Sequence, residues 1–188
     1  IITMAGSKLE NATMLIRDGK IEQVGTNVNV PDGYTEVDLT GKFIYPAFID
    51  LHTTYGLPKP EPSRGRGGWR GPEQIDPDTK GAYNANDAIK SYYQASDDFS
   101  PDEKTAEKLR KAGFGSVLTL REDGIARGTA ALVTLGDQTA NKELIMTQAA
   151  AEYSLNRGTA GQLYPRSMMG YVSLLRQTYL DADWYEDL

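Results

Sequence analysis

Few residues in this sequence could carry chemistry, and the first of them is a histidine. The chain has one His, His52, and no Cys among its 188 residues. His52 directly follows Ala47–Leu51, an apolar run that contains Asp50. An imidazole at this position could bind a metal ion or relay a proton. A single His excludes a multi-histidine metal centre built from this chain alone, and the lack of Cys excludes disulfides, thiolate catalysis and cysteine zinc sites.

Other candidate residues each have a structural alternative. Asp50 could be a carboxylate beside a site, or could accept hydrogen bonds from backbone N–H groups at a turn. The Arg64–Arg70 loop, with Trp69, could bind an acidic or aromatic ligand, or could be a solvated loop. Asp123–Gly128 lacks the spacing of a phosphate cradle and predicts a turn between strands, with Arg127 in an ion pair. We expect only structural roles for the remaining candidates: packing for Tyr92, Tyr93, Tyr164, Met168 and Met169, and an ion pair for Arg176.

Charge and length narrow the possible classes of protein. With 20 Lys and Arg against 26 Asp and Glu, the net charge is −6, which argues against nucleic acid as a partner because phosphate binding needs a basic surface. No apolar stretch approaches the roughly 20 residues that cross a bilayer. The 188 residues allow one large or two small domains, but not a complete (β/α)8 barrel of about 250 residues.

The elements expected to position His52 begin with β structure. Asp18-Gly19 is a hairpin turn signal between two apolar strands. Period-2 alternation and short apolar runs predict the strands that follow. The strands expected in this part are Ala12–Arg17, Lys20–Gly25, Thr35–Leu39, Phe43–Tyr45 and Ala47–Leu51.

A long loop is expected at about 57–100, because this stretch has no hydrophobic period. Within it, Asn86–Gln94 could form a short helix. Ser100 as N-cap, Pro101 and Glu103 predict the start of a helix that ends before Gly113. Helix, Gly and the apolar strand Phe114–Leu120 together make an α/β unit.

The last third mixes strands with one clear helix. Ala130–Leu135 predicts a strand, and Asn141–Glu152 fits either a strand followed by a small-residue surface or a helix. Asn156–Leu163 reads as loop. From Tyr164-Pro165-Arg166-Ser167 onward, apolar residues recur at helical spacing at least to Trp184. The chain starts at Ile1 without Met, and its last helix has no C-terminal stop signal before the chain ends. We therefore expect a piece of a longer protein.

Three motifs in order between Ala12 and Gly56 resemble the amidohydrolase superfamily. They are Arg17–Gly25, which contains Asp-Gly-Lys-Ile and Val-Gly; Asp38-Leu39-Thr40-Gly41-Lys42; and Pro46–Thr54. The resemblance covers about a quarter of the chain firmly. Farther on, Gly124–Val133 looks like a stretch of large exported bacterial proteins with two amidohydrolase-related halves.

The resemblance implies an α/β fold. A β-sandwich portion over 1–45 would be followed, over 46–188, by the first strands and helices of a (β/α)8 barrel that this chain does not complete. The family has His-x-His after its first barrel strand, and His52 matches the first His. Thr54 replaces the second, and a neutral hydroxyl is a poor zinc ligand. His52 is therefore the candidate metal residue, and its alternative is a His at a strand end, hydrogen-bonded to a neighbour.

Two functions follow from the resemblance. The whole protein would hydrolyse C–N bonds of amides or cyclic amides with zinc or another divalent metal, and this chain alone would be inactive. Alternatively, this part would be a non-catalytic scaffold or interaction module that supports an active half or a larger exported assembly. In either case we expect the remainder of the protein or a second chain to complete the barrel. The resemblance to exported proteins implies an extracytoplasmic location.

Overall fold

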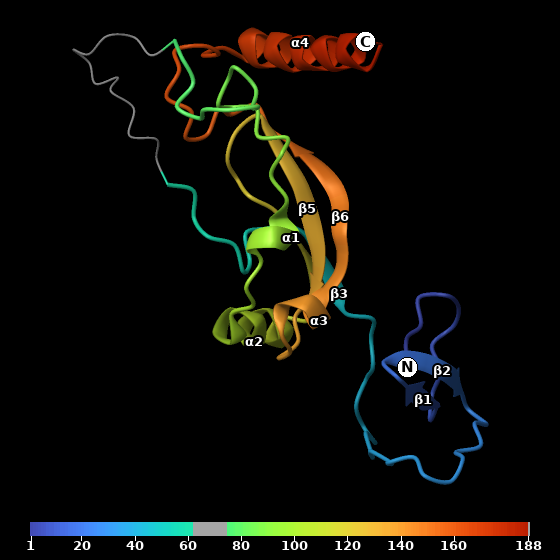
Figure 1. Cartoon of the computed structure of the whole chain (residues 1–188). Coiled ribbons are helices and arrows are strands. Elements are labelled where there is room, and N and C mark those ends of the chain that lie inside the picture. The colour runs from blue at the N-terminus through green and yellow to red at the C-terminus, as the bar shows by residue number, and fades with distance from the viewer. Residues whose placement is uncertain (62–74, 188) are drawn as a thin grey trace. The chain divides into compact units, whose positions relative to one another are not determined.

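The computed structural model describes residues 1–61 and 75–187, which divide into two compact units, Ile1–Ala47 and Phe48–Leu188. The elements in these described residues are both helices and strands (Figure 1). The predicted α/β class is confirmed at this level. The predicted Arg64–Arg70 loop lies outside the described residues.

Unit Ile1–Ala47 is built on one hairpin. Strand β1 (Thr13–Arg17) pairs antiparallel with β2 (Lys20–Gly25). Asp18 and Gly19 both have positive φ, at 50° and 72°, as the tightest hairpin turn requires. Leu15 is the buried side chain of this hairpin, at 6% exposure.

The strands predicted at Thr35–Leu39 and Phe43–Tyr45 are wrong. This whole stretch is irregular, and the alternating Val37 and Leu39 are exposed. Asp38 instead accepts hydrogen bonds from the backbone N and the hydroxyl of Thr40, which bends the chain locally. Alternation of polar and apolar residues predicts a strand only where a partner strand can bond its backbone N–H and C=O groups. Unit Ile1–Ala47, which is described in full, has no third strand.

Unit Phe48–Leu188 contains a four-stranded sheet in the order β3-β4-β5-β6. Figure 1 labels β3, β5 and β6 of this sheet. Its strands are β3 (Phe48–Thr53), β4 (Phe114–Thr119), β5 (Ala126–Thr134) and β6 (Leu144–Tyr153). Strands β3 and β4 are parallel, whereas β4–β5 and β5–β6 are antiparallel. The long excursion between β3 and β4 permits a parallel crossover, but the short link from β4 to β5 does not.

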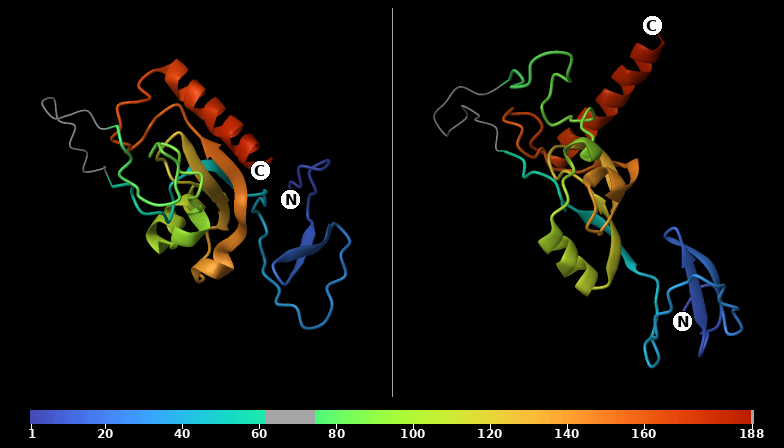
Figure 2. Two further views of the ribbon diagram at one scale, coloured as in Figure 1. Left: turned by 45° about the horizontal axis from the view of Figure 1, so that its top comes forward. Right: turned by 60° about the horizontal axis from the view of Figure 1, so that its bottom comes forward.

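Two helices lie on one face of this sheet (Figures 1 and 2). They are α1 (Ala95–Asp98) and α2 (Glu103–Lys111). The helix start predicted at Ser100 is wrong: Asp102 is the N-cap and accepts from the backbone N of Thr105. The backbone N of Ser100 instead donates to Gly56 O at 2.9 Å.

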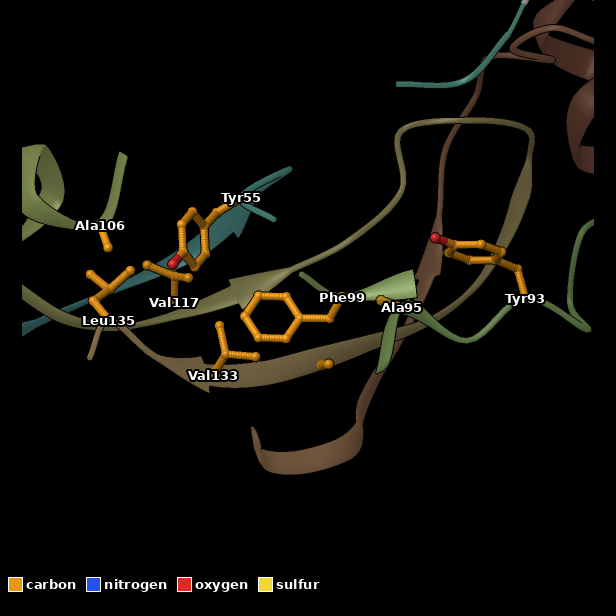
Figure 3. Close-up of a cluster of buried hydrophobic side chains, with 9 residues drawn as sticks. Tyr55, Tyr93, Ala95, Phe99, Ala106, Val117, Val133 and Leu135 are labelled. Atoms are coloured by element: carbon orange, nitrogen blue, oxygen red, sulfur yellow. The ribbon is translucent and has the colours of Figure 1, made fainter. Parts of the chain in front are cut away.

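The core lies between these helices and the sheet, and it gathers residues far apart in the sequence (Figure 3). The ring of Phe99 meets that of Tyr55 edge to face at 5.8 Å between centroids. Val117 on β4 and Val133 on β5 are both fully buried against them. This packing ties the segment after β3 to β4 and β5.

The helix considered at Asn86–Gln94 is wrong. Ile89 and Gln94 instead form parallel bridges with Ala126 and Thr129 of β5. The backbone N of Lys90 donates to Ala126 O at 2.7 Å. These backbone groups therefore bond to β5 rather than to a helical turn, and Ile89 is buried there.

After β5 the chain forms α3 (Ala140–Glu143), β6 and α4 (Met168–Glu186). Of the two readings of Asn141–Glu152, the strand is confirmed from Leu144 onward, and the helix is wrong beyond the single turn of α3. The long helix is confirmed, with Ser167 as N-cap. Core packing of Met168 and Met169 is wrong, because they are 60% and 82% exposed. No helix in the described parts of the chain is long and apolar enough to cross a membrane.

Candidate functional site

The candidate site lies where two parallel strands end. Strands β3 and β4 run side by side, with Thr53 opposite Thr119. The backbone N of Leu120 donates to Thr53 O at 2.9 Å, which holds the two strand ends together. Residues just past these ends must therefore share one edge of the sheet.

His52 and Glu122 meet at this edge. The Nδ1 atom of His52 lies 3.5 Å from the Glu122 Oε1 atom, and the two side chains are 57% and 49% exposed. Sequence reasoning selected His52 but missed Glu122. The available signal was its position three residues after Thr119, the last residue of β4, because parallel strands present their carboxyl ends at one edge.

Thr54 does not continue the strand. Strand β3 ends at Thr53, and Thr54 O accepts a hydrogen bond from the backbone N of Leu57 at 3.2 Å. Thr54 therefore starts a turn, and its side chain is exposed. Asp50 Oδ1 accepts from the backbone N of His52 at 3.1 Å, which is the backbone role considered for it.

Beside Glu122, Asp123 anchors a buried polar network. Its side chain is 1% exposed, with Lys90 Nζ at 3.4 Å and Arg121 Nη2 at 3.6 Å from Oδ2. The backbone N and the hydroxyl of Thr159 donate to Oδ1 at 2.7 and 2.9 Å. Because Asp123 and Arg121 are held inward and Glu122 lies between them, Glu122 faces outward toward His52.

Arg121 also stacks on a buried ring. Its guanidinium carbon lies 4.8 Å from the ring centroid of Tyr93. Burial raises the pKa of the Tyr93 phenol to about 12. Tyr93 is therefore neutral at physiological pH and helps fix Arg121, in line with the packing role expected for it.

Glu143, a second buried carboxylate, has a structural role. Burial by itself would raise its pKa, but hydrogen bonds from the Thr134 hydroxyl and the backbone N–H groups of Gln138 and Gly136 hold the pKa below its usual range. These donors close the turn between β5 and β6 around an ionised Glu143. It is fully engaged there and is not a free general base.

The remaining sequence candidates lie outside this edge. Arg127 Nε donates to Gly124 O at 3.3 Å, and the turn before it is shorter than expected because β5 begins at Ala126. The expected ion pair of Arg176 is not found in the part of the chain that the structure describes. Tyr92 is half exposed and packs against the Tyr83 ring, while Tyr164 donates to Gly170 O.

Two hollows in the described parts of the chain have other lining residues. One of about 550 Å³ has Tyr83, Asp181 and Trp184 among its lining residues. The other, of about 510 Å³, lies in unit Ile1–Ala47, beside Arg17 and Tyr34. Neither is lined by His52 or Glu122.

The described residues do not make a metal centre by themselves. Within 1–61 and 75–187 there is no group of three or more His, Cys, Asp or Glu side chains placed to hold a metal ion. A catalytic zinc takes three protein ligands and one open position. His52 would supply one such ligand, and Glu122 lies on the Nδ1 side of its ring, so at least two further ligands would have to come from other residues.

Comparison with known proteins gives short sequence matches and an extended fold match. No family model matches the chain. It is 41% identical to a dihydroorotase of Mycobacterium tuberculosis over 44 residues, which are 23% of this chain and 10% of that protein. It is 44% identical to a dihydroorotase of Listeria monocytogenes over 48 residues, 26% of this chain and 11% of that protein. The match to an imidazolonepropionase of Staphylococcus aureus is 40% over 50 residues, 26% of this chain and 12% of that protein.

The fold match is to an amidohydrolase from Thermotoga maritima MSB8. The TM-score is 0.69 at 23% sequence identity, over 93% of this chain and 43% of that protein. The present chain thus spans less than half of the solved structure and about a tenth of the curated relatives.

Proposed function

We propose that this chain is the N-terminal part of an amidohydrolase-type protein that hydrolyses C–N bonds of amides or cyclic amides with a divalent metal. The short sequence matches and the fold match support this relationship. In this proposal, residues 1–45 contribute to a β-sandwich and residues 46–188 open a (β/α)8 barrel. The barrel is completed by the remainder of the same protein or by a second chain.

The position of His52 carries the proposal. It lies near the carboxyl end of β3, the first strand of the parallel pair β3–β4. Active sites of (β/α)8 barrels form at this end of the strands. A metal held there, with His52 and residues beyond those described, would activate water and polarise a carbonyl.

Exposed apolar residues on β3 support a covering partner. Phe48, Ile49 and Leu51 are 67%, 55% and 69% exposed. A parallel barrel strand is normally buried on both faces. The proposed remainder of the barrel would cover these side chains. The resemblance to exported proteins also supports an extracytoplasmic location, which we propose with it.

A non-catalytic scaffold is the second candidate, and Thr54 is the observation that favours it. The residue that replaces the second motif His is a neutral hydroxyl, at the start of a turn. In this reading the chain would position or stabilise an active half elsewhere, and His52 would hold no metal.

Hydrolysis by the whole protein distinguishes these functions. We expect turnover of at least one compound in a panel of linear and cyclic amides, lost on chelation and restored by zinc or another divalent ion. His52→Asn should lower kcat/KM because it removes a metal ligand. Asp137→Asn, which changes an exposed carboxylate elsewhere, is the control and should leave kcat/KM unchanged. No turnover with any ion would favour the scaffold. Turnover that His52→Asn leaves unchanged would show that His52 does not belong to the active site.

A further inference from the structure

We propose that Glu122 is a positioning residue that selects the protonation state of the two ring nitrogens of His52, leaving Nε2 as the atom that meets a metal or a ligand. This inference rests on the proposed function for what Nε2 would contact. The Glu122–His52 relationship itself requires no metal.

The geometry orients one nitrogen. Nδ1 of His52 faces the Glu122 carboxylate at 3.5 Å. A carboxylate only accepts hydrogen bonds, so it favours the neutral form of imidazole that carries its proton on Nδ1. That form leaves the lone pair on Nε2, the atom that could ligate a metal or accept a proton. The Nδ1–Oε1 separation is that of an ion pair, and among the described residues no hydrogen bond to either ring nitrogen of His52 is seen.

The backbone on both sides supports this pairing. Hydrogen bonding between Asp50 Oδ1 and the backbone N of His52 fixes the strand end. On the other side, Arg121 and Asp123 are held by the buried network. Glu122 therefore faces His52 from an anchored segment. Histidine ligands in metal sites commonly donate their second N–H to a carboxylate, which is the type of partner that Glu122 offers to Nδ1.

Glu122 lies outside the His-x-His motif, so its role can be tested independently of metal binding. It follows β4, a different strand from that of His52 and Thr54. The influence of Glu122 on the His52 ring therefore does not depend on the missing second His of the His-x-His motif. A scaffold without metal would show the same pairing, so the two hypotheses fail independently.

The test is a two-bond ¹H–¹⁵N correlation spectrum of the imidazole in the metal-free whole protein, at pH 9 where a histidine is neutral. The His52 signal is identified by its loss in His52→Asn. We expect the Nδ1–H form to be enriched in the native protein relative to Glu122→Ala. For an exposed ion pair the change in the ratio of the two forms should be about 1.5- to 5-fold.

Two controls sharpen the result. Glu107→Ala removes a carboxylate that pairs with Lys111 and should leave the ratio unchanged. Glu122→Gln keeps an acceptor atom and should retain part of the enrichment. Since Glu122 is half exposed, these variants should fold, which the amide spectrum checks. A native protein dominated by the Nε2–H form, or a ratio that Glu122→Ala does not change, would overturn the proposal.

Metal binding in the same variants separates this proposal from the proposed function. If both hold, Glu122→Ala should weaken metal affinity of the whole protein by about 10- to 100-fold, as losses of such carboxylates do elsewhere. A change in the His52 ratio without any metal binding would support the positioning role of Glu122 and overturn the hydrolase. Metal binding together with a ratio that Glu122→Ala does not change would support the hydrolase and overturn the positioning role of Glu122.

Discussion

Asp123→Ala should destabilise unit Phe48–Leu188 by about 3–5 kcal/mol, the cost typical of leaving buried ionic partners uncompensated. The substitution removes the carboxylate that lies near Lys90 and Arg121 and that accepts two hydrogen bonds from Thr159. Lys90 is itself largely buried, at 12% side-chain exposure. Urea unfolding followed by circular dichroism measures the loss.

Asp123→Asn and Asp137→Ala make the matched comparison. The amide of Asn keeps an acceptor for Thr159 but loses the charge, so a smaller loss is expected. Asp137 is exposed and accepts from the side chain of its neighbour Gln138, so its removal should change stability little. Equal effects of Asp123→Ala and Asp137→Ala would show that the network does not hold this unit together.

Gly128→Ala should destabilise the same unit by about 2–4 kcal/mol, combining a left-handed backbone with overpacking. Gly128 has φ +83°, and a Cβ there would lie 2.0 Å from the backbone O of Tyr93. That oxygen also accepts from the backbone N of Thr129 at 2.9 Å. The segment carrying Tyr93, on which Arg121 stacks, would therefore have to move.

Gly81→Ala isolates the conformational part of this effect. Gly81 has φ +118°, and an added Cβ would meet only the side chain of Tyr83, at 3.5 Å or more. A smaller shift in thermal midpoint is expected for Gly81→Ala than for Gly128→Ala. If the two shifts are equal, the close approach of β5 to Tyr93 is not what requires glycine.

Local signals predicted the elements that local geometry determines. The hairpin of β1 and β2 follows from Asp18-Gly19, whose positive φ angles need no distant contact. Strand β4 follows from its apolar run, and helix α4 from its period and from the Ser167 hydroxyl, which accepts from the backbone N of Gly170 at 3.1 Å. In each case the sequence segment contains most of the information that defines the element.

The errors arose where partners lie far away in the sequence. Alternation at Thr35–Leu39 looks like a strand, but no strand is there to pair with it. The segment Asn86–Gln94 contains residues compatible with a helix, yet its backbone bonds to β5, more than thirty residues later. Such pairing depends on tertiary context, which overrides local propensity.

The candidate site was half predictable for the same reason. His52 follows from its motif and its place after an apolar strand. Glu122 can be recognised as a neighbour of His52 only once β3 and β4 are known to be adjacent and parallel. The outward direction of its side chain depends in turn on the burial of Asp123, which periodicity does not reveal.

The exposed apolar residues were predictable in outline, from the incomplete barrel, but not residue by residue. Strand β3 has the composition of a strand buried on both faces, yet Phe48 and Leu51 are more than 60% exposed. Helix α4 likewise packs Tyr171, Leu174 and Leu175 inward, while Trp184 is exposed. Sequence pattern reports which residues suit burial, and which of them this chain can cover by itself depends on the assembled fold.

Metal content of the whole protein, with and without His52, tests the central claim most directly. The native protein and His52→Asn would be saturated with zinc, manganese or cobalt in turn, desalted, and analysed for metal per chain. The proposed hydrolase predicts a stoichiometric divalent metal in the native protein that is largely lost in His52→Asn, with the circular dichroism spectrum unchanged. Native protein that retains no metal, or an equal metal content in the variant, would contradict a metal site at the end of β3.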